Sequence, residues 1–229
     1  MLNTKQFSEL HPVLWQVMSD FFNSKLKNFP CLYAISSFNK DAMYFGVSSL
    51  KNSVEIVAND LKEMSLLLDS ERDKKSKTLN TYVHIFQDNR IENVRDFLVN
   101  LLQDLNHIDE CKWLDNSPKD MNEADFKFCF NNRLWLPILL SPAHPSTIRC
   151  CRYTLIAFQP SVTFDYNKQE RPEYYQRMRT STHGRIDNFY SAGKPYYLSK
   201  KSSGKNIVQF IGADLSEFDS TYSYPVIVK

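Results

Sequence analysis

Hydrophobic residues recur three and four positions apart in several stretches of this chain, which is the spacing of one face of a helix. The spacing predicts amphipathic helices from about Pro12 to Leu26, from Ser53 to Leu68 and from Val94 to Leu105. Side chains of aspartate and asparagine accept hydrogen bonds from the free N–H groups of a helix start, so Asp88-Asn89 is expected to cap the third helix. The polar run from Ser70 to Lys77 is expected to be a solvated loop.

A fourth helix is expected to begin at Arg171-Pro172-Glu173, because proline is tolerated in a first helical turn. It would extend towards Tyr190. Glycine weakens a helix interior by roughly 1 kcal/mol, so a kink or break is expected near Gly184. The residues expected to share one face of this helix are Tyr175, Met178, Thr182 and Ile186.

Short apolar or alternating stretches between turn signals predict strands. Residues 82–86 alternate between two faces, and His84 on this strand is expected to be a structural histidine with satisfied hydrogen bonds. The short strands expected outside the hairpin described next are Cys31 to Ser37, Met43 to Val47, Tyr82 to Phe86 and Ile207 to Ile211.

The stretch from Asp125 to Phe158 is the centre of the predicted sheet. Phenylalanine alternates with other residues from 125 to 130, which is typical of a half-buried strand. Asn131-Asn132 follows directly, and asparagine tolerates the positive φ angles of a two-residue hairpin turn. The return strand, Leu134 to Leu140, is apolar enough to be buried on both sides. Pro137 lacks an N–H group, which predicts a bulge or an edge position there.

A loop containing two prolines follows the hairpin and leads to a third strand that ends at Gln159-Pro160. Both prolines restrict the residues around them, so His144 between them is expected to sit on a stiff loop at a strand end. Cys150-Cys151 would point to opposite faces of a strand and are expected to be small buried residues. The order of elements predicts one α+β domain over residues 1–229, with a core from about 12 to 215 and a mostly antiparallel sheet flanked by helices.

Composition narrows the classes of protein to which this chain can belong. The formal net charge of +2 argues against a dedicated nucleic-acid surface, although three lysines lie close together near residue 75. No apolar run approaches the ~20 residues that span a bilayer, and no signal peptide is expected. The five cysteines have no disulfide-type spacing, which favours a reducing cytoplasm. The chain has only five glycines and no glycine-rich phosphate loop, so Rossmann and P-loop nucleotide sites are not expected.

Chemistry is expected at His144 more than at any other position. The chain has no CxxC, HExxH, GxSxG or CxxCH motif. Imidazole is a good ligand for iron or zinc and a good general base. No second histidine or carboxylate lies close to His144 in sequence, and a lone histidine suits an axial heme ligand better than a zinc site. Cys31 is expected to be a core thiol, although its thiolate would be a strong iron ligand.

The motifs of this chain resemble, in content and in order, those of the bacterial YqcI/YcgG family. The resemblance covers roughly residues 29–215, and the glycine that the family has soon after its first motif is absent here. The matching segments are Phe29-Pro30-Cys31, the helix FLVNLLQDLNHID that ends at Asp109, the hairpin DFKFCFNN, Pro142-Ala143-His144, the pair Arg149 and Arg152, the strand ending FQP, Arg185 to Phe189, and Gln209-Phe210.

Characterised relatives look like heme-dependent N-oxygenases, among them enzymes that hydroxylate a guanidine nitrogen in guanitoxin and D-cycloserine biosynthesis. The resemblance implies noncovalent heme b, dioxygen or peroxide with an electron donor, and a small cationic amine or guanidine substrate. It implies His144 as the iron ligand, with Cys31 as second choice.

The same resemblance implies roles for three further residues. Arg149 and Arg152 would bind the heme propionates. Asp187 would hold the substrate nitrogen, with pairing to Arg185 or another arginine as the alternative. His183, in the arginine-rich helix, is either a solvated residue or a second candidate catalytic residue. The alternatives are a heme or small-ligand binding protein without turnover, and a structural interaction module. A homodimer is one possible assembly.

Overall fold

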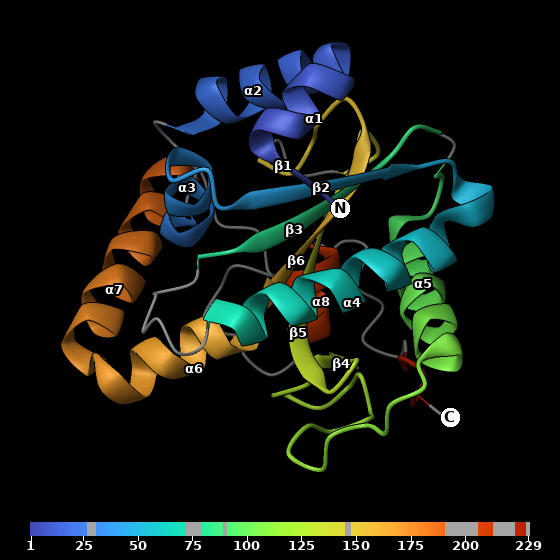
Figure 1. Ribbon diagram of the computed structural model, residues 1–229. Helices are drawn as coiled ribbons and strands as arrows, with labels where there is room; N and C mark the ends of the chain where they lie inside the picture. Colours follow the sequence, from blue (N-terminus) through green and yellow to red (C-terminus); the bar gives the residue numbers. More distant parts are fainter. Residues whose placement is uncertain are drawn as a thin grey trace.

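The computed structural model describes residues 1–26, 31–71, 79–88, 91–144, 148–190, 206–212 and 223–227. Figure 1 shows how the elements in these ranges are arranged. In chain order they are β1 (Leu2–Asn3), α1 (Thr4–Leu10), α2 (Pro12–Leu26), α3 (Leu32–Asn39), β2 (Met43–Ser48), a 3-10 turn (Leu50–Asn52), α4 (Ser53–Glu71), β3 (Thr81–Phe86), α5 (Val94–Ile108), β4 (Phe128–Phe130), β5 (Arg133–Leu140), β6 (Thr154–Pro160), α6 (Ser161–Glu170), α7 (Pro172–Phe189) and α8 (Asn206–Ile211).

The described strands form one mostly antiparallel sheet in the order β1-β2-β3-β6-β5-β4, so the fold class is α+β as predicted. The pair β2 and β3 is parallel, and the other described pairs are antiparallel. A parallel pair needs a crossover connection, and α4 lies in the segment between these two strands. The other pairings place the hairpin strand β5 next to β6, with its partner β4 at the end of the strand order.

Helices cover both faces of the sheet (Figure 1). Side chains of α1 and α2 pack with one face, and those of α4, α5 and α8 pack with the other. Because both faces are covered, all six residues of β3 are buried. A further group, α3, α6 and α7, packs together beside the sheet. None of the helices in the described ranges is long and apolar enough to cross a membrane.

The hairpin has the predicted two-residue turn. Asn131 and Asn132 have φ angles of 51° and 56°, and Phe130 pairs with Arg133 across the turn. Of the two alternatives predicted at Pro137, the bulge is wrong, because Pro137 pairs with Phe158 in regular register. The short strand β4 pairs only as far as Trp135, so the side of β5 that faces β4 is unpaired at Pro137. Pro137 therefore has the predicted edge position locally, although β5 lies inside the sheet between β4 and β6.

Two predicted strands are helices in the structure. Residues 32–39 form α3, in which Tyr33 and Ser37 are buried one turn apart, and the Ser37 hydroxyl donates to the Tyr33 carbonyl. Residues 206–211 form α8. Four of the six residues of α8 are buried. A short and mostly buried run shows no hydrophobic periodicity, so its sequence does not distinguish a helix from a strand.

Other local predictions were also corrected by the structure. Asn93 caps α5 by accepting from the backbone N–H groups of Arg95 and Asp96, in place of the predicted Asp88-Asn89. Cys150 is exposed and Cys151 is buried, and both precede β6 instead of lying in a strand. The helices α1 and α6 were not predicted, because α1 is short and α6 is mostly polar.

Helix α7 continues through Gly184 without a break, so the predicted interruption is wrong. A Cβ atom at Gly184 would meet no atom within 4 Å. The glycine therefore leaves open space on an exposed helix surface. The buried Ile186 holds this part of α7 against the rest of the protein.

Replacing Gly184 by alanine should stabilise the protein by about 0.5–1 kcal/mol, because alanine loses less backbone freedom in a helix. The free energy of chemical unfolding measures this change. The matched control is Gly46→Ala in β2, where the new Cβ atom would overlap Asp60 Oδ2 and the Tyr82 hydroxyl. This control should lose at least about 2 kcal/mol. A loss of stability in Gly184→Ala would contradict the open surface seen at this position.

Candidate functional site

The loop after β5 holds His144 in a buried position, with 4% of its surface exposed. The Ser141 hydroxyl lies 3.3 Å from Thr154 Oγ1 and accepts from the Ala143 N–H group at 3.2 Å. The backbone N–H of His144 donates to the Ser141 carbonyl at 3.1 Å, and that of Ser141 donates to the Arg149 carbonyl at 3.1 Å. These bonds tie the loop to β6 and close it at its base.

His144 and Arg149 both contact the C-terminal end of α8. His144 Nε2 lies 3.1 Å from the Ile211 carbonyl oxygen, and Arg149 Nη1 donates to the Phe210 carbonyl at 3.2 Å. A carbonyl can only accept, so Nε2 carries the proton in this bond. The last carbonyls of a helix lack partners within the helix, and a positive charge beside them is favourable. The two side chains therefore cap α8.

Gly212 makes this close approach possible. Its φ is +76°, a conformation that favours glycine, and its N–H donates to the Val208 carbonyl at 2.8 Å. A Cβ atom there would overlap His144 Nε2 and would lie 2.6 Å from Arg149 Nη1. The end of α8 thus requires glycine both for its backbone and for its neighbours.

Cys31 lies within electrostatic range of Arg149, although 118 residues separate the two in sequence. It precedes α3 as the N-cap residue. Burial raises the pKa of its thiol, while the backbone N–H groups of Ala34 and Tyr33, the Arg149 charge and a hydrogen bond from Gln159 oppose the rise. The pKa stays above its ordinary value, so the thiol is protonated at neutral pH in this arrangement.

Comparison with known proteins connects this arrangement to a family. The model of the YqcI/YcgG family matches residues 18–217. The chain belongs to the YqcI/YcgG family. A relative in Bacillus subtilis (strain 168), "Uncharacterized protein YqcI", is 25% identical over 166 residues, which are 66% of this chain and 64% of that protein. The chain thus spans just under two thirds of the length of this relative, and no solved structure matches it.

Motif residues of this YqcI/YcgG family member that are distant in sequence come together in the fold. Arg149 contacts the same helix end as His144 and lies within electrostatic range of Cys31. Gln159, from the FQP motif, bonds to Cys31. Four predicted motif segments therefore meet around one loop and one helix end.

The contacts described above at the end of α8 do not include the other predicted site residues. Arg152 is exposed, with its guanidinium carbon 5.9 Å from the centre of the Tyr153 ring. Asp187 is exposed and His183 is partly buried on α7, which packs against α3 and α6, whereas α8 packs against β5 and α5. The roles of Arg152, His183 and Asp187 remain predictions.

In the part of the chain that the structure describes, no group of three or more histidine, cysteine, aspartate or glutamate side chains is arranged to hold a metal ion. A heme iron differs from such a site, because the porphyrin supplies four ligands and the protein needs to supply only an axial one. His144 is the predicted residue for that position.

A second polar cluster, not predicted from the sequence, crosses the core between α4, β3 and β2. Asp60 Oδ2 accepts from the Tyr82 hydroxyl at 2.7 Å, Tyr82 Oη lies 2.7 Å from His84 Nδ1, and His84 Nε2 lies 2.7 Å from Ser48 Oγ. Because Tyr82 donates to a carboxylate, it accepts from Nδ1–H, and Nε2 then accepts from Ser48. Gly46 leaves room for the cluster.

This buried cluster satisfies both ring nitrogens of His84, as predicted for a structural histidine. Burial lowers the pKa of His84 to about 3. Burial, together with the neighbouring Asp60 carboxylate, raises the pKa of Tyr82. Asp60 Oδ1 in turn lies 2.8 Å from the amino group of Met1. The sequence does contain one sign of this buried polar cluster, because Asp60 interrupts the apolar face of α4 between Val57 and Leu61.

Stability should fall as the pH drops below about 6.5. The unfolded chain binds a proton at His84 near pH 6.5, whereas the folded protein binds it only near pH 3, so protonation favours unfolding within this range. Each pKa unit is worth about 1.4 kcal/mol. Chemical unfolding of wild type and His84→Gln at pH 7, 5 and 4 measures the effect. The variant should be less stable at pH 7 and should lose less on acidification.

The matched control for this pH series is His107→Gln, because His107 is exposed on α5. It should keep the pH dependence of the wild type. If the curves of His84→Gln and wild type fell in parallel, the buried neutral state of His84 would be contradicted.

Proposed function

We propose that this YqcI/YcgG family member is a heme-dependent oxygenase that hydroxylates a nitrogen of a small amine or guanidine, such as an arginine-like metabolite. The observation that carries the proposal is that His144 and Arg149 both contact the end of α8, and that Cys31 lies within electrostatic range of Arg149. Segments whose resemblance implied a heme site are brought together by the fold. A reducing, cytoplasmic setting would keep the five free thiols reduced.

The chemistry of these side chains suits heme b. A buried imidazole is a common axial ligand, and a guanidinium suits the carboxylate of a propionate. The geometry sets one condition on this role. His144 Nε2 faces the Ile211 carbonyl at 3.1 Å, so ligation through Nε2 requires this bond to separate. Arg149 uses one of its N–H groups for Phe210, and a guanidinium has five.

Each residue in the proposal has a distinct task. Bound heme would supply the activation of oxygen. His144 would hold the heme in place, and Arg149 and Arg152 would pair with its carboxylates. Asp187 pairs with the substrate cation, since a charge that leaves water needs a partner. His183, four residues earlier on α7, is the candidate for moving a proton at the substrate nitrogen.

The proposed reaction replaces an N–H bond by N–O–H. One oxygen atom of dioxygen enters the product, and the other is reduced to water. This reduction consumes two protons and two electrons, and an external two-electron donor supplies the electrons. With peroxide in place of dioxygen, the donor is not needed. The alternative function is a heme or small-ligand binding protein without turnover, in which the same residues bind and no oxygen is transferred.

Protein produced with a heme precursor should show a Soret band with about one heme per chain. His144→Ala should abolish or shift the band, and added imidazole should restore it by occupying the vacated ligand position. Cys31→Ser should leave the band nearly unchanged, because burial keeps this thiol protonated. His107→Ala on the surface of α5 is the control. A spectrum altered only by Cys31→Ser would replace His144 by a thiolate ligand, and the lack of any band after reconstitution would reject heme binding.

Heme-loaded protein incubated with arginine or related amines, a reductant and oxygen should give a product heavier by one oxygen atom. Asp187→Asn should reduce this product by at least about tenfold while the Soret band stays intact, because a neutral amide pairs poorly with a cation. Mass spectrometry measures the product. Glu173→Gln in the first turn of the same helix is the control and should keep activity. Full heme loading with no oxygenated product from any amine would leave the binding-protein alternative.

A further inference from the structure

We infer that the end of α8 occupies the position from which His144 would bind heme, so that docking of α8 and binding of heme exclude each other. The Ile211 carbonyl lies 3.1 Å from His144 Nε2, and the Phe210 carbonyl accepts from Arg149 Nη1 at 3.2 Å. This arrangement is the closed form of the site, and heme would bind to an open form in which the end of α8 has moved. The inference rests on the proposed function, because it concerns the same site.

The nitrogens of His144 and Arg149 converge on one small region. A Cβ atom built on Gly212 would overlap His144 Nε2 and would lie 2.6 Å from Arg149 Nη1, so a single atom at this point meets both side chains. Only 4% of His144 and 9% of Arg149 is exposed. A ligand that reaches both nitrogens at this point therefore has to take the place of the end of α8.

The segment that carries His144 is the fixed partner in this contact. The Ser141 N–H donates to the Arg149 carbonyl at 3.1 Å, and the Ser141 hydroxyl lies 3.3 Å from Thr154 Oγ1 in β6. Both Ser141 and Thr154 are fully buried, so water does not compete for the bond between them. These bonds hold the segment against the sheet when the contact with α8 opens.

The end of α8 is the movable partner. The helix has six residues, and a helix of this length depends on packing and capping because it is not stable alone in water. Gly212 follows it with a φ of +76°, and its N–H donates to the Val208 carbonyl at 2.8 Å. Glycine adopts positive and negative φ about equally readily. The chain can therefore leave the helix in another direction at Gly212, which turns the Ile211 carbonyl away from His144.

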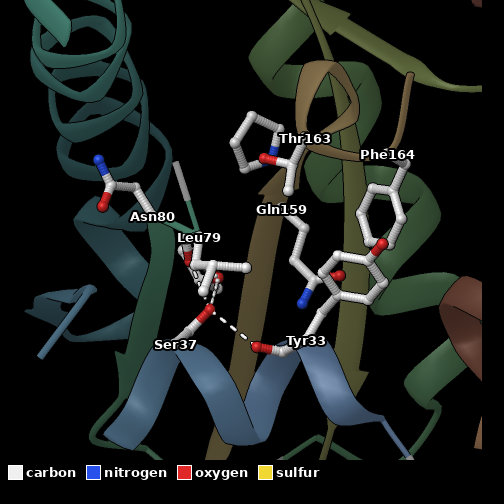
Figure 2. Close-up of a pocket in the computed structure, with 9 residues that line it drawn as sticks. Tyr33, Ser37, Leu79, Asn80, Gln159, Thr163 and Phe164 are labelled. Carbon is white, nitrogen blue, oxygen red and sulfur yellow. Dashed lines mark hydrogen bonds between the residues drawn. The ribbon is translucent and has the colours of Figure 1, made fainter. Parts of the chain in front are cut away.

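A pocket close to Cys31 is too small to receive a porphyrin without such a movement. Figure 2 shows this pocket, which lies between α3, β6 and α6 and has Gln159 among its lining residues. Gln159 also bonds to Cys31. The enclosed part of the pocket has room for about a single water molecule. A heme that contacts His144 would therefore gain its space by displacing the end of α8.

Competition for His144 couples the affinity for heme to the docking of α8. A ligand that binds only the open form has its apparent affinity reduced to the fraction of molecules in that form. A change that weakens the docking of α8 should therefore strengthen heme binding, and the coupling is reciprocal. Ile211 is the residue to change, because its side chain is 1% exposed and its carbonyl is the one that faces His144.

Ile211→Val should bind hemin about two- to tenfold more tightly than the wild type, because it removes buried apolar contact from the docked helix end. Titration of the full heme-free chain with hemin, followed by absorption, measures the affinity. The matched control is Ile85→Val in β3. Ile85 is fully buried in the cluster on the opposite face of the sheet from α8, so this control should lose stability without binding hemin more tightly.

Hydrogen–deuterium exchange at the Gly212 amide reports the end of α8 directly, because this N–H donates to the Val208 carbonyl. Mass spectrometry of overlapping peptides from the full chain measures it. Without heme, His144→Ala should exchange at least about tenfold faster than the wild type at Gly212, because a cap of the helix is lost. His107→Ala on the surface of α5 is the control and should exchange like the wild type. Added hemin should also accelerate exchange at Gly212 in the wild type.

The outcomes separate this inference from the proposed function. If hemin binds while Gly212 exchange and the affinity of Ile211→Val stay unchanged, the competition is overturned and the proposed heme site stands. Unchanged Gly212 exchange in heme-free His144→Ala would overturn the role of His144 in holding the end of α8, whether or not hemin binds. If neither the wild type nor Ile211→Val binds hemin, the proposed function is rejected and this inference falls with it.

Discussion

Two backbone carbonyl groups at the end of α8 accept hydrogen bonds from two side-chain nitrogens, and the arrangement of the motif residues depends on these bonds. His144 Nε2 faces Ile211, and Arg149 donates to Phe210. Both side chains are buried, so these bonds satisfy polar groups that water cannot reach easily. Gly212 has a φ of +76° at this point and leaves room for both side chains. Burial raises the pKa of the Cys31 thiol, and the charge of Arg149 in the same segment is among the effects that oppose this rise.

The fold could be predicted where local chemistry is strong. Asn131 and Asn132 specify their turn, and the long apolar face of α4 specifies a helix. The segments of α3 and α8 were mistaken for strands, because a short apolar run fits either structure until its neighbours are known. At Pro137 the local rule predicted an unpaired side of the strand, and the short partner strand β4 provides it because its pairing ends at Trp135.

The candidate site could be predicted only in part, for a similar reason. The type of residue and its stiff loop pointed to His144, but its partner Ile211 lies 67 residues away. The contact between Cys31 and the surroundings of Arg149 likewise depends on how α3 packs. The buried chain from Asp60 to Ser48 was missed because its members come from three elements, each carrying at most two of them. Binding of heme iron by His144 Nε2 would require the hydrogen bond between this nitrogen and the Ile211 carbonyl to separate.

His144 and Arg149 close tightly around Gly212, and a double-mutant cycle tests this packing most directly. Gly212→Ala adds a Cβ atom that would overlap His144 Nε2, at a position whose φ of +76° already disfavours alanine. Chemical unfolding should show a loss of at least about 2 kcal/mol for this change in the wild type. In a His144→Ala background the overlap is absent, so the loss should be smaller by at least about 1 kcal/mol. Equal losses in both backgrounds would contradict the account.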